Sequence, residues 1–112
     1  MIGCIFGEDF ECESFEVEYW SNDPKFRGGT YPPKHIRIQF ENGYGASIIA
    51  YGIGAEEGLY ELAVLDCDGH CIFSDVPLSD GYAEHLDELG VIGCLTHEKV
   101  LNILTQLKNL RK

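Results

Sequence analysis

Alternating hydrophobic and polar residues dominate the start of the chain. In FECESFEVEYW, residues 10–20, side chains of opposite character follow one another, a pattern typical of a β-strand that buries one face. The apolar side carries Phe15, Val17 and Tyr19, and the acidic side carries Glu16 and Glu18. The short apolar stretch 1–6 predicts another strand, so residues 1–20 are interpreted as acidic N-terminal strands.

A second alternating segment, HIRIQFENGYGASIIAY at residues 35–51, contains the strongest turn signal. Asn42-Gly43 suits a two-residue type I′ turn, because both central positions of that turn need positive φ. Such a turn pairs Glu41 with Tyr44 and Ile38 with Ser47. The face predicted to meet the core then carries Ile36, Ile38, Phe40, Ile49 and Tyr51, and the opposite face carries His35, Arg37, Gln39, Glu41, Tyr44 and Ile48.

A similar turn signal, Asp68-Gly69, predicts a second hairpin over residues 59–75. A two-residue turn there pairs Cys67 with His70 and Asp66 with Cys71. Paired residues share a face, so Cys67 and Cys71 would point to opposite faces of the sheet. LDCDGHC, residues 65–71, is therefore interpreted chiefly as a turn, although a longer loop would break this inference.

The rest of the chain divides into loops and helices. Two glycines and three prolines make residues 21–34 a loop, which carries Lys25, Arg27 and Lys34 as a small basic island with Arg37 just beyond. GIGAEEG, residues 52–58, is a flexible connection. Residues 77–112 form a helical C-terminal part, in which a short helix over 77–90 begins at Ser79 or Asp80 and ends at Gly90.

The last segment is the clearest helix in the sequence. Thr96 is a good N-cap, Glu98 suits the positive first turn, and basic residues suit the negative end. The apolar residues recur at helical spacing, at Val100, Leu101, Ile103, Leu104, Leu107 and Leu110, and the basic ones are Lys108, Arg111 and Lys112. Residues 1–112 are thus predicted to form a single α+β domain, an antiparallel β-sheet meander with a C-terminal helix packed on one face.

Charge is the main deviation in composition. Nineteen acids against eight bases give a net charge of −11, and residues 1–23 hold seven acids and no base. A phosphate backbone would be repelled, which argues against direct binding of nucleic acid. An acidic surface instead suits a basic partner, including a host protein with a basic surface that normally holds nucleic acid. The alternative is that the acids only keep a small protein in solution.

Compartment follows from the N-terminus and the cysteines. The start lacks a basic region and its apolar run is broken by acids, so it does not resemble a signal peptide, and no apolar run approaches the roughly 18 residues of a membrane span. Five cysteines exclude a complete disulfide framework. We therefore expect a cytoplasmic protein, in a bacterial host cytosol, with reduced and mostly buried thiols.

Two Cys-x-x-His pairs are the only candidate metal ligands with suggestive spacing. If the protein binds zinc, Cys67, His70, Cys94 and His97 are the ligands, since thiolate and imidazole suit a tetrahedral site. The sequence favours a structural role for them instead, with no metal and no cofactor. Cys94 before a helix start is the best candidate nucleophile, but no convincing set of acid, base and nucleophile is visible, so the protein is not predicted to be an enzyme.

The segments KHIRIQFENGYGASII, LYELAVLDCDG and DVPLSDG, followed by the leucine-rich last helix, resemble small uncharacterised bacteriophage-encoded proteins. The resemblance lies in the FENGYG and YELAVL patterns and covers roughly residues 34–112. It implies a phage accessory protein with no established activity. By analogy, many such small acidic proteins inhibit host defence, including anti-CRISPR and anti-restriction proteins.

The leading hypothesis is therefore a small acidic protein that inhibits a host nucleic-acid-handling defence complex by occupying its basic surface. Aromatic anchors inside an acidic rim suit such an interface. The predicted partner-binding residues are Glu11, Glu13, Glu16, Glu18, Tyr19 and Trp20. The alternatives are an interaction module without inhibitory activity and a small zinc-stabilised domain. No membrane is expected as a partner, and the sequence is compatible with either a monomer or a homodimer.

Overall fold

The computed structural model describes residues 1–19, 33–51, 58–70, 78 and 91–110. It confirms the predicted α+β class. Two sheets are present in these residues, a two-stranded hairpin and a five-stranded antiparallel sheet in the order β3-β4-β5-β6-β7. The elements are β1 Ile2–Ile5, β2 Glu8–Glu11, β3 Ser14–Glu18, β4 His35–Gln39, β5 Gly45–Ile49, β6 Tyr60–Leu65, β7 Val91–Leu95 and α2 His97–Asn109.

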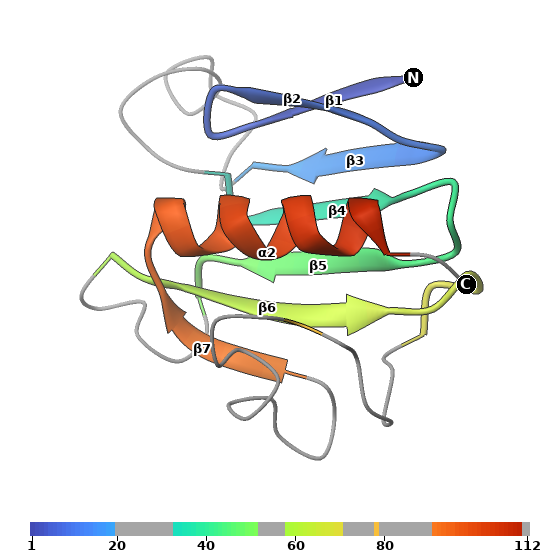
Figure 1. Ribbon diagram of the computed structural model, residues 1–112. Helices are drawn as coiled ribbons and strands as arrows, with labels where there is room; N and C mark the ends of the chain where they lie inside the picture. Colours follow the sequence, from blue (N-terminus) through green and yellow to red (C-terminus); the bar gives the residue numbers. More distant parts are fainter. Residues whose placement is uncertain (20–32, 52–57, 71–77, 79–90, 111–112) are drawn as a thin grey trace.

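The helix α2 covers one face of the larger sheet, and the β1–β2 hairpin lies beyond β3 (Figure 1). The apolar stripe of α2 meets the inward side chains of the middle strands, which is the physical reason that the helix lies there. The completely buried side chains include Ile38, Leu62, Val64, Val100, Ile103, Leu104 and Leu107. The C-terminal helix was therefore predicted correctly, with Thr96 as its N-cap: its hydroxyl accepts a hydrogen bond from the Lys99 amide.

The predicted register of the β4–β5 hairpin is wrong by one residue. Ile38 pairs with Ala46, and the Phe40 amide donates to the Tyr44 carbonyl, so three residues form the loop. Gly43 has φ of 91°, whereas Asn42 does not share the positive φ that a type I′ turn requires. The extra loop residue exchanges the faces of the second strand: Ile48 is buried, and Ile49 joins His35 on the face away from α2.

The same correction applies to the turn at residues 66–70. The Asp66 amide donates to the His70 carbonyl, and Gly69 has φ of 80°, so the loop again holds three residues. The predicted pairing of Cys67 with His70 is wrong. The Asp66 carboxylate accepts from the amides of Asp68 and His70, which favours this longer turn.

The N-terminal alternation belongs to two strands instead of one. It breaks at Cys12 and Glu13, between β2 and β3. β1 and β2 join at Phe6 and Gly7, whose φ values of 49° and 84° are the signature of a type I′ turn. The type I′ turn that the sequence predicts at Asn42-Gly43 thus occurs instead at Phe6-Gly7. Phe6 is unexpected there, because residues other than glycine, asparagine and aspartate rarely adopt positive φ. The Phe6 ring stacks on the His97 ring, with 4.1 Å between the ring centroids, and this contact helps to hold the backbone conformation.

A strand that the sequence did not predict, β7, precedes the helix in the segment assigned to the helical C-terminal part. It pairs with β6, and a bulge places Gly93 and Cys94 opposite Glu61. Cys94 adopts φ of 57°, a conformation that non-glycine residues adopt at a cost. The bulge turns the chain from the edge of the sheet into α2.

One polar side chain joins the β4–β5 turn to the end of the helix. The Asn42 amide nitrogen donates to the carbonyls of Leu107, Lys108 and Leu110, at 2.7, 3.1 and 2.8 Å. Its oxygen accepts from the Tyr44 amide at 3.0 Å. The Leu107 carbonyl also accepts from the Leu110 amide at 3.3 Å, so Asn42 adds to this bond and acts as a tertiary C-cap for the last carbonyls of the helix.

Several predictions fall outside the described residues. They are Trp20, most of the 21–34 loop with Lys25 and Arg27, most of the 52–58 connection, Cys71 with the second strand of the predicted 59–75 hairpin, the helix over 77–90 apart from Leu78, and Arg111 and Lys112.

Asn42→Ala removes the donor from three helix-terminal carbonyls. We expect the free energy of unfolding, measured by urea denaturation, to fall by about 1–3 kcal/mol, because partly buried acceptors lose their partner. Asn109→Ala is the matched control at the same end of α2: Asn109 is exposed and should change stability by less than about 0.5 kcal/mol. Equal losses in the two variants would contradict the capping role.

Candidate partner-binding surface

The acidic residues of the first two hairpin strands and β3 are all exposed. The alternation that places Phe10 and Cys12 in the core leaves the carboxylates outside. They do not form one stripe, however, because the chain turns between β2 and β3. The exposed acids are Glu8, Asp9, Glu11, Glu13, Glu16 and Glu18.

The predicted acids therefore point in different directions. Glu16 and Glu18 lie on the sheet face opposite α2, since Phe15 and Val17, which alternate with them along β3, pair with the core residues Ile38 and Ile36. Glu11 lies opposite the exposed Ile2 on the outer face of the β1–β2 hairpin. Glu13 lies at the break between the two strands. The structure thus brings Glu16 and Glu18 together and separates them from Glu11.

Basic residues just before β4 and within it lie beside two of these acids. Lys34 Nζ lies 3.2 Å from the Glu18 carboxylate, and Glu16 pairs with Arg37 across β3 and β4. Arg37 donates to the Gly69 carbonyl, so the guanidinium also holds the 66–70 turn. Of the six exposed acids, Glu18 alone has an ion pair within the residues that the structure describes.

The predicted aromatic anchors are Tyr19 and Trp20. Tyr19 follows β3 directly and is half-buried, whereas Trp20 lies outside the described residues. The polar residues of β4 on the face that carries Glu16 and Glu18 form hydrogen bonds with neighbouring strands and turns. His35 Nε2 lies 2.6 Å from the Ser47 hydroxyl, and the Gln39 amide donates to the Asp66 backbone carbonyl at 2.6 Å. A hollow of about 320 Å³ remains beside them, lined by Ser14, Glu16, Arg37, Gln39, Cys67, Asp68 and Gly69.

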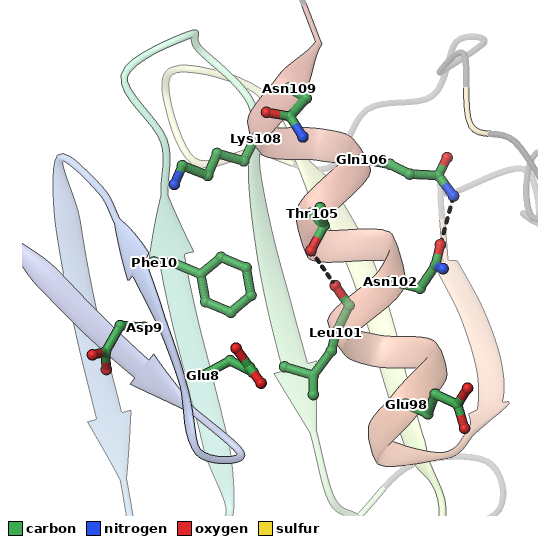
Figure 2. A pocket seen from close by; sticks show the side chains of 10 residues that line it. All are labelled: Glu8, Asp9, Phe10, Glu98, Leu101, Asn102, Thr105, Gln106, Lys108 and Asn109. Atoms are coloured by element: carbon green, nitrogen blue, oxygen red, sulfur yellow. Dashed lines mark hydrogen bonds between the residues drawn. The ribbon is translucent and has the colours of Figure 1, made fainter.

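A larger groove, of about 570 Å³, runs between β2 and α2 (Figure 2). Phe10 and Leu101 approach it from the two elements, and Glu8 points from β2 toward the helix, whereas Asp9 points away. The sequence did not predict this groove, because its two sides lie about ninety residues apart. The lining residues are Glu8, Asp9, Phe10, Glu98, Leu101, Asn102, Thr105, Gln106, Lys108 and Asn109.

The four candidate zinc ligands are not brought together. His97 lies near the first residue of β6, where its Nε2 is 2.9 Å from the Tyr60 hydroxyl. Cys67 follows the other end of β6, about 20 Å away at the rise of an extended chain. Within the described residues no three histidine, cysteine or acidic side chains are placed to share a metal ion.

The thiols are more exposed than predicted. Cys4, Cys67 and Cys94 are exposed and Cys12 is buried, all four in the reduced form. Exposure follows from position: Cys67 lies in a turn, Cys94 in a bulge, and Cys4 on the outer face of the β1–β2 hairpin. Burial raises the pKa of the Cys12 thiol, although the N-terminal ammonium and a hydrogen bond with the Gly3 backbone partly oppose the rise.

Comparison with protein-family models, with curated proteins and with solved structures finds no match to this chain. Among the described residues, no helix has the length and apolar character needed to cross a membrane.

Native thiol reactivity should follow this placement. Iodoacetamide is expected to modify Cys4, Cys67 and Cys94 first and to leave Cys12 largely unmodified, because Cys12 is both buried and depleted in thiolate. Peptide mass spectrometry after timed labelling measures the four rates, and labelling in denaturant provides the control. Modification of Cys12 at the rate of the exposed thiols would show that its burial is wrong.

Alkaline pH should weaken the fold. Burial raises the pKa of Cys12 above 9.0 and that of Tyr60 above 10.0, so the unfolded chain loses these protons at lower pH than the folded chain. The folded state then binds more protons, and the free energy of unfolding falls as pH rises through these values. Tyr60→Phe should reduce this fall between about pH 9 and about pH 11, measured by urea denaturation. An unchanged pH dependence in this variant would contradict the assignment.

Proposed function

We propose that this protein binds a basic, nucleic-acid-binding surface of a host protein and inhibits that protein by occupying the surface. The observation that carries the proposal is the exposure of six acids between residues 8 and 18, of which Glu18 alone has an ion pair among the described residues. These acids are exposed above an apolar core. They remain accessible to a partner of opposite charge.

Electrostatics connects such binding with inhibition. A surface that holds nucleic acid is rich in lysine and arginine, and an acidic protein competes with the phosphates for the same side chains. The net charge of −11 favours fast association with this partner and disfavours nucleic acid itself. In this proposal the protein acts by binding, without catalysis, in the cytosol of a bacterial host.

The resemblance to phage-encoded proteins suggests the class of partner. A phage accessory protein of this kind would meet the host's defence complexes, of the CRISPR or restriction type, which bind nucleic acid through basic channels. We therefore place the partner in that class. Glu16 and Glu18, which lie together on one face of β3, are the centre of the proposed interface.

Charge reversal on β3 tests the proposal. The partner is first captured from lysates of defence-equipped bacteria, and its affinity for the purified protein is then measured at low and at physiological salt. Glu16→Lys should weaken binding at low salt by about five-fold, equivalent to about 1 kcal/mol, and less at higher salt, because exposed charges are screened within about 8 Å. Binding should also displace nucleic acid from the partner.

Glu41→Lys is the matched control. Glu41 is also exposed, and either exchange changes the net charge from −11 to −9, because each replaces −1 with +1. It lies four residues beyond Arg37, the cross-strand neighbour of Glu16, or about 13 Å along the strand direction. Equal weakening by the two variants would show that the loss of affinity comes from the change in net charge and not from the position of Glu16. Unchanged affinity in Glu16→Lys would reject β3 as the interface.

A further inference from the structure

We propose that the groove between β2 and α2 binds one arginine or lysine side chain of the partner. The inference rests on the proposed function for the source of that side chain, a basic protein surface. The groove itself is a separate feature, on the helix-covered side of the molecule, away from Glu16 and Glu18. It would form a second point of contact.

The shape of the groove suits a long side chain with an apolar stem. Its volume of about 570 Å³ lies within the roughly 300–1,000 Å³ of typical ligand pockets. The half-buried Leu101 and the small exposed part of Phe10 provide apolar surface where the hairpin and the helix approach one another (Figure 2). The methylene stem of lysine or arginine buries against such surface while the charged head stays near water.

The charges define where the head group lies. Glu8 points from β2 toward the helix, whereas Glu98, in the first turn of α2, lines the groove with its side chain directed away from β2 (Figure 2). Glu8 is therefore the main contact for the head group. Neither carboxylate has an ion-pair partner among the described residues. The full negative charge of Glu8 exceeds the roughly half positive charge of the helix N-terminus, which by itself would disfavour a cation.

Lys108 gives the groove a direction. It lies in the last turn of α2, ten residues from Glu98, or about 15 Å along the helix axis. A cation is therefore repelled at this end and attracted at the Glu8 end. Two other polar side chains of the lining bond within the helix: the Thr105 hydroxyl donates to the Leu101 carbonyl, and the Gln106 amide donates to the Asn102 side chain.

A capped peptide, acetyl-Ala-Arg-Ala-amide, tests the groove without the partner. The full chain, labelled with ¹⁵N, is titrated with this peptide and with its citrulline analogue, which is neutral and nearly the same shape. We expect amide shifts that map to residues 8–10 and 98–109 for the arginine peptide and much smaller shifts for the analogue. Shifts spread evenly over all the exposed acids, or no shifts at millimolar peptide, would overturn the proposal.

Single substitutions in the groove test whether each charge attracts or repels the peptide. Glu8→Gln should weaken peptide binding by about five-fold, Glu98→Gln by about two-fold, and Lys108→Gln should strengthen it by about two-fold, because the last change removes a repulsive charge. Glu41→Gln is the matched control and should leave peptide affinity unchanged, because Glu41 is an exposed acid in the β4–β5 turn that does not line the groove. Each variant is checked by circular dichroism. If Glu98→Gln destabilises the helix, Glu8→Gln, which lies outside it, decides the result.

The outcomes separate this inference from the proposed function. Loss of partner affinity in Glu16→Lys with no peptide bound in the groove would leave the proposed function standing and reject the groove. Peptide bound in the groove with unchanged partner affinity in Glu16→Lys would reject β3 as the interface and retain the groove. Equal peptide affinity in Glu8→Gln and the unsubstituted protein would reject the groove directly.

Discussion

The amide group of Asn42 determines how the helix and the sheet fit together. The last carbonyls of a helix have no amide one turn further along to bond, and here a single side chain from the β4–β5 turn donates to three of them, of which Leu107 also accepts from the Leu110 amide. The contact fixes the end of α2 above that turn, while Thr96 and the bulge at Cys94 fix its beginning. With both ends held, the apolar stripe of α2 faces Ile38, Leu62 and Val64, and its other side forms a wall of the groove.

The parts of the fold that depend on local chemistry could be predicted from the sequence. The cap at Thr96 indicates where α2 begins, and the spacing of Val100, Leu104 and Leu107 indicates which face of the helix is buried. The hairpin register failed because Gly43 adopts positive φ in both a two-residue and a three-residue loop, so the dipeptide Asn-Gly does not distinguish them. One residue more in the loop exchanges the faces of a whole strand, which moved Ile48 into the core.

The candidate surface was predictable in exposure but not in arrangement. Alternation correctly placed Glu16 and Glu18 outside, because Phe15 and Val17 must point inward. Nothing local indicates that the chain breaks at Cys12 or that Phe6 adopts a glycine-like conformation, since the His97 ring that it contacts comes from the far end of the sequence. The groove likewise lies between segments from the two ends of the sequence, so local patterns alone did not reveal it.

The stacking of Phe6 on His97 also bears on the order in which the protein is made. The two rings are about ninety residues apart, and contacts of such high sequence separation close late and slow the folding reaction. Until the ribosome releases α2, the buried side chains Ile5 and Phe10 lack part of their cover. During synthesis the N-terminal hairpin thus exposes an apolar surface that is prone to aggregation. The many acidic residues around it would help to keep nascent chains apart by mutual repulsion.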